Sequence, residues 1–100
     1  LEERPTAIVA GNDRMAYGLY DAARELGFRV PDDISVVGFD DDESATLVYP
    51  PLTTVVQPIA EMASAALDAV ISLSEGGEAE SRHFPTRLIV RASTSSPKRG

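Results

Sequence analysis

Two short apolar runs separated by an amphipathic helix constrain the fold of this chain more than any other feature. The runs are residues 6–10 (TAIVA) and 34–39 (ISVVGF), and both are rich in the branched residues that favour strands. Asn12 and Asp13 are good helix N-cap residues, and Gly27 suits the left-handed position that ends a helix. Strand, helix and strand within residues 6–39 predict a βαβ unit with two parallel strands.

The helix between these runs has apolar residues at spacings of three and four, which predicts one buried face. That face would consist of Met15, Leu19, Ala22, Ala23 and Leu26. Gly18 lies inside the helix, where glycine costs about 1 kcal/mol relative to alanine. Its presence therefore indicates close packing at that position.

The rest of the chain predicts two further strands and one more helix. Residues 52–56 (LTTVV) and 86–91 (TRLIVR) read as strands. Pro58 suits the first position of a helix over residues 58–74, which Gly76 and Gly77 would end. Its predicted apolar face contains Ile59, Met62, Ala66, Val70 and Leu73.

Composition and charge exclude several classes of function. At 100 residues the chain is one domain or less, and it has no cysteine for disulfides, thiolate metal sites or nucleophilic catalysis. All 16 acidic residues precede residue 82, together with only four of the nine basic residues. Because nucleic acids are bound by clustered Lys and Arg, this acidic body does not bind DNA by itself. No apolar run approaches the roughly 20 residues of a membrane helix, so we expect no membrane partner.

Polar residues follow both strands of the predicted βαβ unit. Open parallel sheets bind ligands beyond the carboxyl ends of their strands, and both ends lie at the same edge. Asn12 and Asp40 are therefore candidate ligand-binding residues, able to bracket a hydroxyl or amine group. The alternative, which local sequence alone favours, is that Asn12 or Asp13 caps the helix and Asp40 begins an Asx turn.

The acidic run after the second strand also has an enzymatic interpretation. Asp40, Asp42 and Ser44 resemble the nucleophile loop of haloacid-dehalogenase-type phosphatases, in which two carboxylates hold Mg²⁺. Such sites need a lysine on the phosphoryl group; the only lysine is Lys98, near the chain end, and Arg91 is a poor substitute. We interpret the run as a solvated acidic turn and expect no catalytic residue, metal or cofactor.

Six blocks of sequence, in order, resemble the C-terminal part of lactose-repressor/galactose-repressor-type transcriptional regulators. The resemblance covers residues 5–97. The blocks are Pro5–Ile8, then Gly11-Asn12-Asp13 with Met15-Ala16 and Gly18, then Leu26-Gly27 with Val30–Asp33, then Ile34–Asp41, then Pro51–Val55 with Gln57-Pro58, and finally Pro85–Arg91 with Ser93-Thr94. Any one block is weak evidence, but six in the family's order are strong.

The resemblance implies an α/β fold, namely part of a periplasmic-binding-protein-like (type I) effector domain, which has two lobes. Residues 1–49 would be the βαβ unit of the C-terminal lobe with its effector edge. Residues 50–81 would cross to the N-terminal lobe and form its helix, residues 82–94 would return, and residues 95–100 would be a tail. The family's DNA-reading helix-turn-helix is not among these residues, so we expect a piece of a longer protein.

The resemblance also implies functional residues. Asn12 and Asp40 match positions that contact the effector in the family; Arg14, Gln57 and Ile59 match positions that do so in some relatives. Tyr17 and Val48 match dimer-interface positions, and the alternative for Tyr17 is a half-exposed surface aromatic.

The function implied by the resemblance is that of a cytoplasmic, homodimeric regulator that senses a small molecule, expected to be a sugar. DNA would be bound only through the absent headpiece, and the chain would not be an enzyme. A periplasmic sugar-binding transport protein is the nearest alternative, and the Mg²⁺-dependent phosphatase is the alternative of another class.

Overall fold

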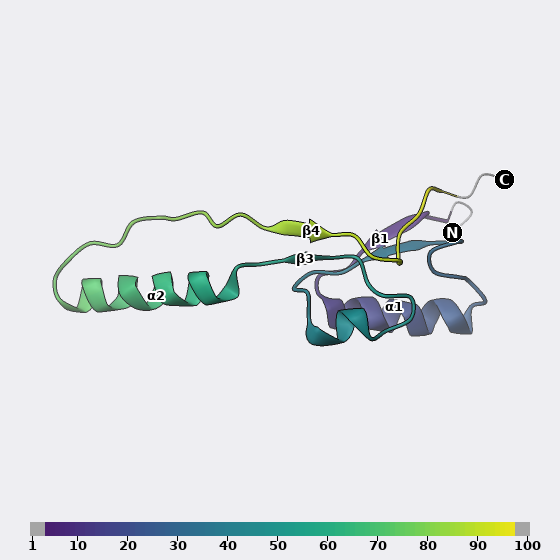
Figure 1. Cartoon of the computed structure of the whole chain (residues 1–100), viewed down its shortest axis with the longest axis horizontal. Helices are drawn as coiled ribbons and strands as arrows, with labels where there is room; N and C mark the ends of the chain where they lie inside the picture. The colour runs from purple at the N-terminus through teal and green to yellow at the C-terminus, as the bar shows by residue number, and fades with distance from the viewer. Residues whose placement is uncertain (1–3, 98–100) are drawn as a thin grey trace. The chain divides into compact units, whose positions relative to one another are not determined.

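A computed structural model describes residues 4–97 (Figure 1). In chain order its elements are β1 (Ala7–Val9), α1 (Asp13–Glu25), β2 (Ser35–Val37), the 3-10 helix η1 (Glu43–Thr46), β3 (Thr54–Val56), α2 (Ile59–Ser74) and β4 (Arg87–Ile89). The chain forms two compact units. The first is Leu1–Val56 with Arg87–Gly100, of which residues 4–56 and 87–97 are described, and the second is Gln57–Thr86. Residues 98–100 of the expected tail lie outside the described residues.

The predicted βαβ unit is confirmed within the first unit. β1 and β2 pair in parallel, with Ile8 opposite Val36, and α1 connects them (Figure 1). The sheet continues past β2, because Val37 forms a parallel bridge with Thr53 and Thr53 accepts a hydrogen bond from Gly38 N at 2.9 Å. The segment that follows β2 is therefore held beside the start of the third predicted strand.

Both ends of α1 follow the predicted signals. Asn12 is the N-cap: its Oδ1 accepts a hydrogen bond from Met15 N at 2.8 Å. Leu26 is the C-cap, and Gly27 follows with φ of +79°, the left-handed conformation that glycine adopts without strain.

The predicted buried face of α1 is only partly correct: Ala23 is buried and Leu19 packs against the core cluster, but Ala22 is exposed. Met15 and Leu26 are 59% and 71% exposed. The buried residues are Asp13, Ala16, Tyr20 and Ala23, of which only Ala23 was on the predicted face. These four also recur at spacings of three and four, and the inward-facing carboxylate of Asp13 fixes that face toward the sheet. Nothing lies within 4 Å of where a Cβ of Gly18 would stand, so the expected close packing there is absent.

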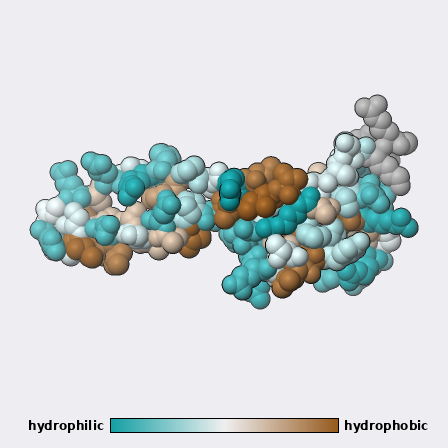
Figure 2. Space-filling view, viewed as in Figure 1, coloured by the Kyte–Doolittle hydropathy of each residue, from teal (hydrophilic) through white to brown (hydrophobic). Residues whose placement is uncertain are grey.

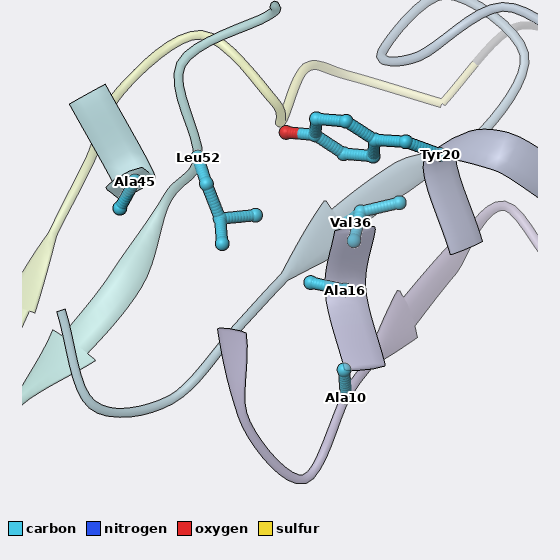
Figure 3. Close-up of a cluster of buried hydrophobic side chains, with 6 residues drawn as sticks. All are labelled: Ala10, Ala16, Tyr20, Val36, Ala45 and Leu52. Atoms are coloured by element: carbon cyan, nitrogen blue, oxygen red, sulfur yellow. The ribbon is translucent and has the colours of Figure 1, made fainter. Parts of the chain in front are cut away.

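The core of the first unit is small and built mainly from short side chains (Figure 3). Its cluster consists of Ala10, Ala16, Tyr20, Val36, Ala45 and Leu52. The ring of Tyr20 is buried while its hydroxyl donates to Pro50 O at 2.8 Å, which satisfies the buried polar atom. The short side chains let α1 approach the sheet closely.

The remaining strands of the first unit form an antiparallel pair. β3 and β4 pair with Thr54 opposite Ile89, so the strands predicted over residues 52–56 and 86–91 are both confirmed. The chain after β4 then binds the βαβ unit. Ser93 is fully buried, and its Oγ accepts from Thr53 N at 2.8 Å and donates to Val36 O at 2.6 Å.

The second unit contains α2, which confirms the helix predicted after Pro58. None of the helix residues is buried; of the predicted apolar face only Met62 is half-buried, whereas Ile59, Val70 and Leu73 are exposed. Apolar side chains on α2 give the brown areas on this unit in Figure 2. Among the described residues, no helix is long and apolar enough to cross a membrane.

Two glycine variants test the packing of the first unit. In Gly38→Ala the new Cβ would overlap Oδ1 of Asp13 and lie 2.8 Å from Cδ2 of Leu52. We expect this variant to lower the free energy of unfolding by about 1–3 kcal/mol. Gly18→Ala, in open space within a helix, should raise it by about 0.5–1 kcal/mol. Urea-induced unfolding measures both, and effects of the same sign would contradict this packing.

The buried tyrosine predicts a loss of stability in alkali. Burial raises the pKa of Tyr20 above its ordinary value of 10.0. The unfolded chain then releases this proton at lower pH than the folded chain, so the free energy of unfolding falls as the pH rises above 10.0. Tyr20→Phe should make that fall shallower in urea unfolding measured across this range. An unchanged slope would contradict the prediction.

Candidate functional site

The carboxyl ends of β1 and β2 meet at one edge, which we call the carboxyl edge and define as residues 11–13 and 38–42. The two loops are joined directly, because Asp13 N donates to Phe39 O at 3.0 Å. Parallel pairing of β1 and β2 therefore brings Asn12 and Asp40 to the same edge, as the sequence predicts.

Asn12 begins α1 and is half-buried at this edge. The capping alternative is confirmed for it, since its Oδ1 accepts from Met15 N. Capping uses only the carbonyl oxygen of the side chain, whereas the amide nitrogen has two N–H donors of its own. A cap and a ligand contact are therefore compatible at this residue.

Asp40 is exposed, and the backbone around it is unusual. Asp40 and Asp41 have φ of +120° and +59°, in the region that non-glycine residues rarely adopt. Such residues cost about 1–3 kcal/mol each and persist where surrounding contacts hold them. Here Asp40 N donates to Val55 O at 2.8 Å, and Asp40 forms a parallel bridge with Val56.

The contact that sequence reasoning missed is made by Asp13, which we predicted to be a cap. Asp13 is 1% exposed. Its Oδ1 accepts from Thr54 Oγ1 and its Oδ2 from Asp42 N, both at 2.6 Å. Those partners lie 41 and 29 residues away in the sequence, so local pattern could not reveal them. The sequence feature that could have indicated this contact is Gly38, a glycine within the run of β-branched residues 34–39. A Cβ at this position would overlap the carboxylate of Asp13.

The other two acidic residues of the loop are also engaged. Asp41 Oδ1 accepts from Arg91 Nη2 at 2.7 Å, and Arg91 Nη1 donates to Leu52 O at 2.9 Å. Asp42 caps η1, because its carboxylate accepts from Glu43 N at 2.9 Å and Ser44 Oγ at 3.0 Å. Among residues 4–97, no three His, Cys, Asp or Glu side chains are grouped to hold a metal ion. These contacts favour an acidic turn over the Asp40/Asp42 phosphatase arrangement.

The remaining predicted residues are spread over both units. Arg14 is exposed in the first turn of α1. Gln57 is half-buried and Ile59 is exposed, and both belong to the second unit.

The two dimer candidates make contacts within the first unit. Tyr17 is half-buried, and its hydroxyl shares a hydrogen bond with Ser44 Oγ at 2.8 Å. Burial raises the pKa of this tyrosine. Val48 is half-buried and packs against the core cluster.

Comparison with known proteins finds a family match over almost the whole chain. Residues 1–94 match the model of the periplasmic binding protein-like domain. Regulator NtdR of the NTD biosynthesis operon from Bacillus subtilis (strain 168) is 38% identical over 97 residues, which cover 94% of this chain and 30% of NtdR. The lactose operon repressor of Rhizobium radiobacter is 42% identical over 99 residues, which cover 97% of this chain and 87% of that protein.

Solved structures of lac repressors also match this chain. The lac repressor dimer bound to operator and the anti-inducer ONPF matches with a TM-score of 0.80 and 38% identity, over 92% of this chain and 32% of that chain. The chain thus spans about a third or less of the length of most of these relatives. It belongs to the periplasmic binding protein-like family, in the branch formed by the effector-binding domains of lactose-repressor/galactose-repressor-type transcriptional regulators.

Proposed function

We propose that this chain is the effector-sensing and dimerisation part of a cytoplasmic DNA-binding transcriptional regulator, and that the carboxyl edge binds the effector through Asn12 and Asp40. The observation that carries the proposal is the hydrogen bond between Asp13 N and Phe39 O, which holds the Asn12 and Asp40 loops together. This edge is where open parallel sheets bind their ligands, beyond the carboxyl ends of the strands.

The chemistry of this pair suits a neutral, hydroxyl-rich effector such as a sugar. Asn12 has amide donors and Asp40 a carboxylate acceptor, so together they can bracket a hydroxyl group at about 1.5–3 kcal/mol per charge-assisted hydrogen bond. The neighbouring Asp42 and Glu43 disfavour an anion. Arg14, Gln57 and Ile59 are proposed as further contacts.

The division of the chain into two compact units is compatible with a two-lobed sensor. We assign residues 50–81 to the crossover and helix of the other lobe and residues 82–94 to the return. An effector bound between lobes would favour the closed state, by as much as its affinities for the two states differ. Closure would then shift the regulator between DNA-competent and DNA-incompetent forms.

Tyr17 and Val48 are the proposed dimer contacts. The solved lac repressor that matches this chain is a dimer bound to operator. DNA binding would use a segment outside this chain, consistent with the acidic body. The phosphatase and transport alternatives are not favoured, because the relatives that match are transcriptional regulators.

The central prediction concerns Asp40 in the full-length regulator. A thermal-shift screen of neutral mono- and disaccharides, lactose included, first identifies the sugar that binds. We expect Asp40→Asn to weaken its binding at least about tenfold in calorimetry, because one charge-assisted hydrogen bond is lost. Operator binding, measured by fluorescence anisotropy, should be unchanged.

Asp21→Asn is the matched control, since it makes the same chemical change at an exposed position of α1. It should leave both affinities unchanged. An unchanged sugar dissociation constant in Asp40→Asn, or an equal loss in Asp21→Asn, would refute the assignment of Asp40.

A further inference from the structure

Asp13 makes hydrogen bonds to the backbone on both sides of Asp40 and Asp41. Its backbone N–H donates to Phe39 O at 3.0 Å, just before Asp40. Its Oδ2 accepts from Asp42 N at 2.6 Å, just after Asp41. The two residues between these contacts are the ones with positive φ. The strained residues Asp40 and Asp41 are thus held at one end by the backbone N–H of Asp13 and at the other by its buried carboxylate.

Thr54 holds the other oxygen of that carboxylate. Its Oγ1 donates to Asp13 Oδ1 at 2.6 Å and accepts from Asp41 N at 3.4 Å. Thr54 is fully buried on β3, whose neighbours Val55 and Val56 also pair with Asp40. The hydroxyl therefore fixes the direction of the carboxylate that receives Asp42 N.

We propose that Asp13, oriented by Thr54, is a positioning residue that holds Asp40 in its effector-binding conformation. Asp13 itself is too buried to touch an effector, so it acts through the backbone of residues 39–42. This inference rests on the proposed role of Asp40. The proposal adds Asp13 and Thr54 to the site, although neither would be identified from helix-capping rules or from contact with an effector.

A hydrogen bond that only stabilised the fold would look similar, so the test needs a matched control. Ser93 is equally buried and its hydroxyl also makes two hydrogen bonds, to Thr53 N and Val36 O, neither within residues 39–42. Ser93→Ala should therefore lower the melting temperature without loosening the Asp40 loop. Thr54→Ser keeps the hydroxyl and serves as the conservative variant.

The experiment uses the full-length regulator with the variants Asp13→Asn, Thr54→Val, Thr54→Ser and Ser93→Ala. Amide hydrogen exchange is measured for the peptide covering residues 39–44, and sugar affinity by calorimetry with the saccharide found in the screen. Thr54→Val, which keeps the size of the side chain, remains informative if Asp13→Asn does not fold.

We expect faster exchange in residues 39–44 and at least about fivefold weaker sugar binding in Thr54→Val. Thr54→Ser and Ser93→Ala should stay within about twofold of the parent affinity. Unchanged exchange in Thr54→Val, or an equal loss of affinity in Ser93→Ala, would overturn the proposal. If instead exchange quickens in Thr54→Val while both it and Asp40→Asn bind sugar normally, the positioning of the loop stands and the effector role of Asp40 fails.

Discussion

The rest of the first unit depends on the buried carboxylate of Asp13. It joins the start of α1, the loop after β2 and the strand β3 through hydrogen bonds to Asp42 N and Thr54 Oγ1. A buried charged group left without partners costs several kcal/mol, so any alternative packing must satisfy both oxygens again. This requirement explains which face of α1 turns inward and why only glycine fits at position 38.

The apolar core could not impose such specificity alone. Three of its six residues are alanines, which have little shape to interlock. Polar contacts between distant segments therefore set much of the arrangement. Ser93 joins the chain after β4 to β2 by a hydrogen bond to Val36 O, and the Tyr20 hydroxyl donates a hydrogen bond to Pro50 O. Each of these groups is buried and has a hydrogen-bond partner. Such satisfied polar groups favour one packing arrangement, because any other would leave them unpaired and destabilise the fold.

The four aspartates of the carboxyl edge have the same side chain but different roles, because each lies in a different environment. Asp13 is buried and connects segments, Asp41 pairs with Arg91, and Asp42 caps η1. Asp40 is exposed, as Asp42 is, and it lies on a backbone that its neighbours hold in a strained conformation. The proposed effector contact therefore falls on an exposed aspartate that does not cap η1.

Short-range pattern in the sequence determined the four strands, the two α-helices and the carboxyl edge, because apolar runs, helix caps and Gly27 act within a few residues; it did not indicate η1. It also pointed to Asn12 and Asp40, since polar residues after parallel strands share an edge. The tertiary structure alone decided the inward face of α1, the burial of Asp13 and the pairing of Asp41 with Arg91 across 50 residues. A side chain's partner over such separations is set by how strands and loops pack, and no local spacing records it.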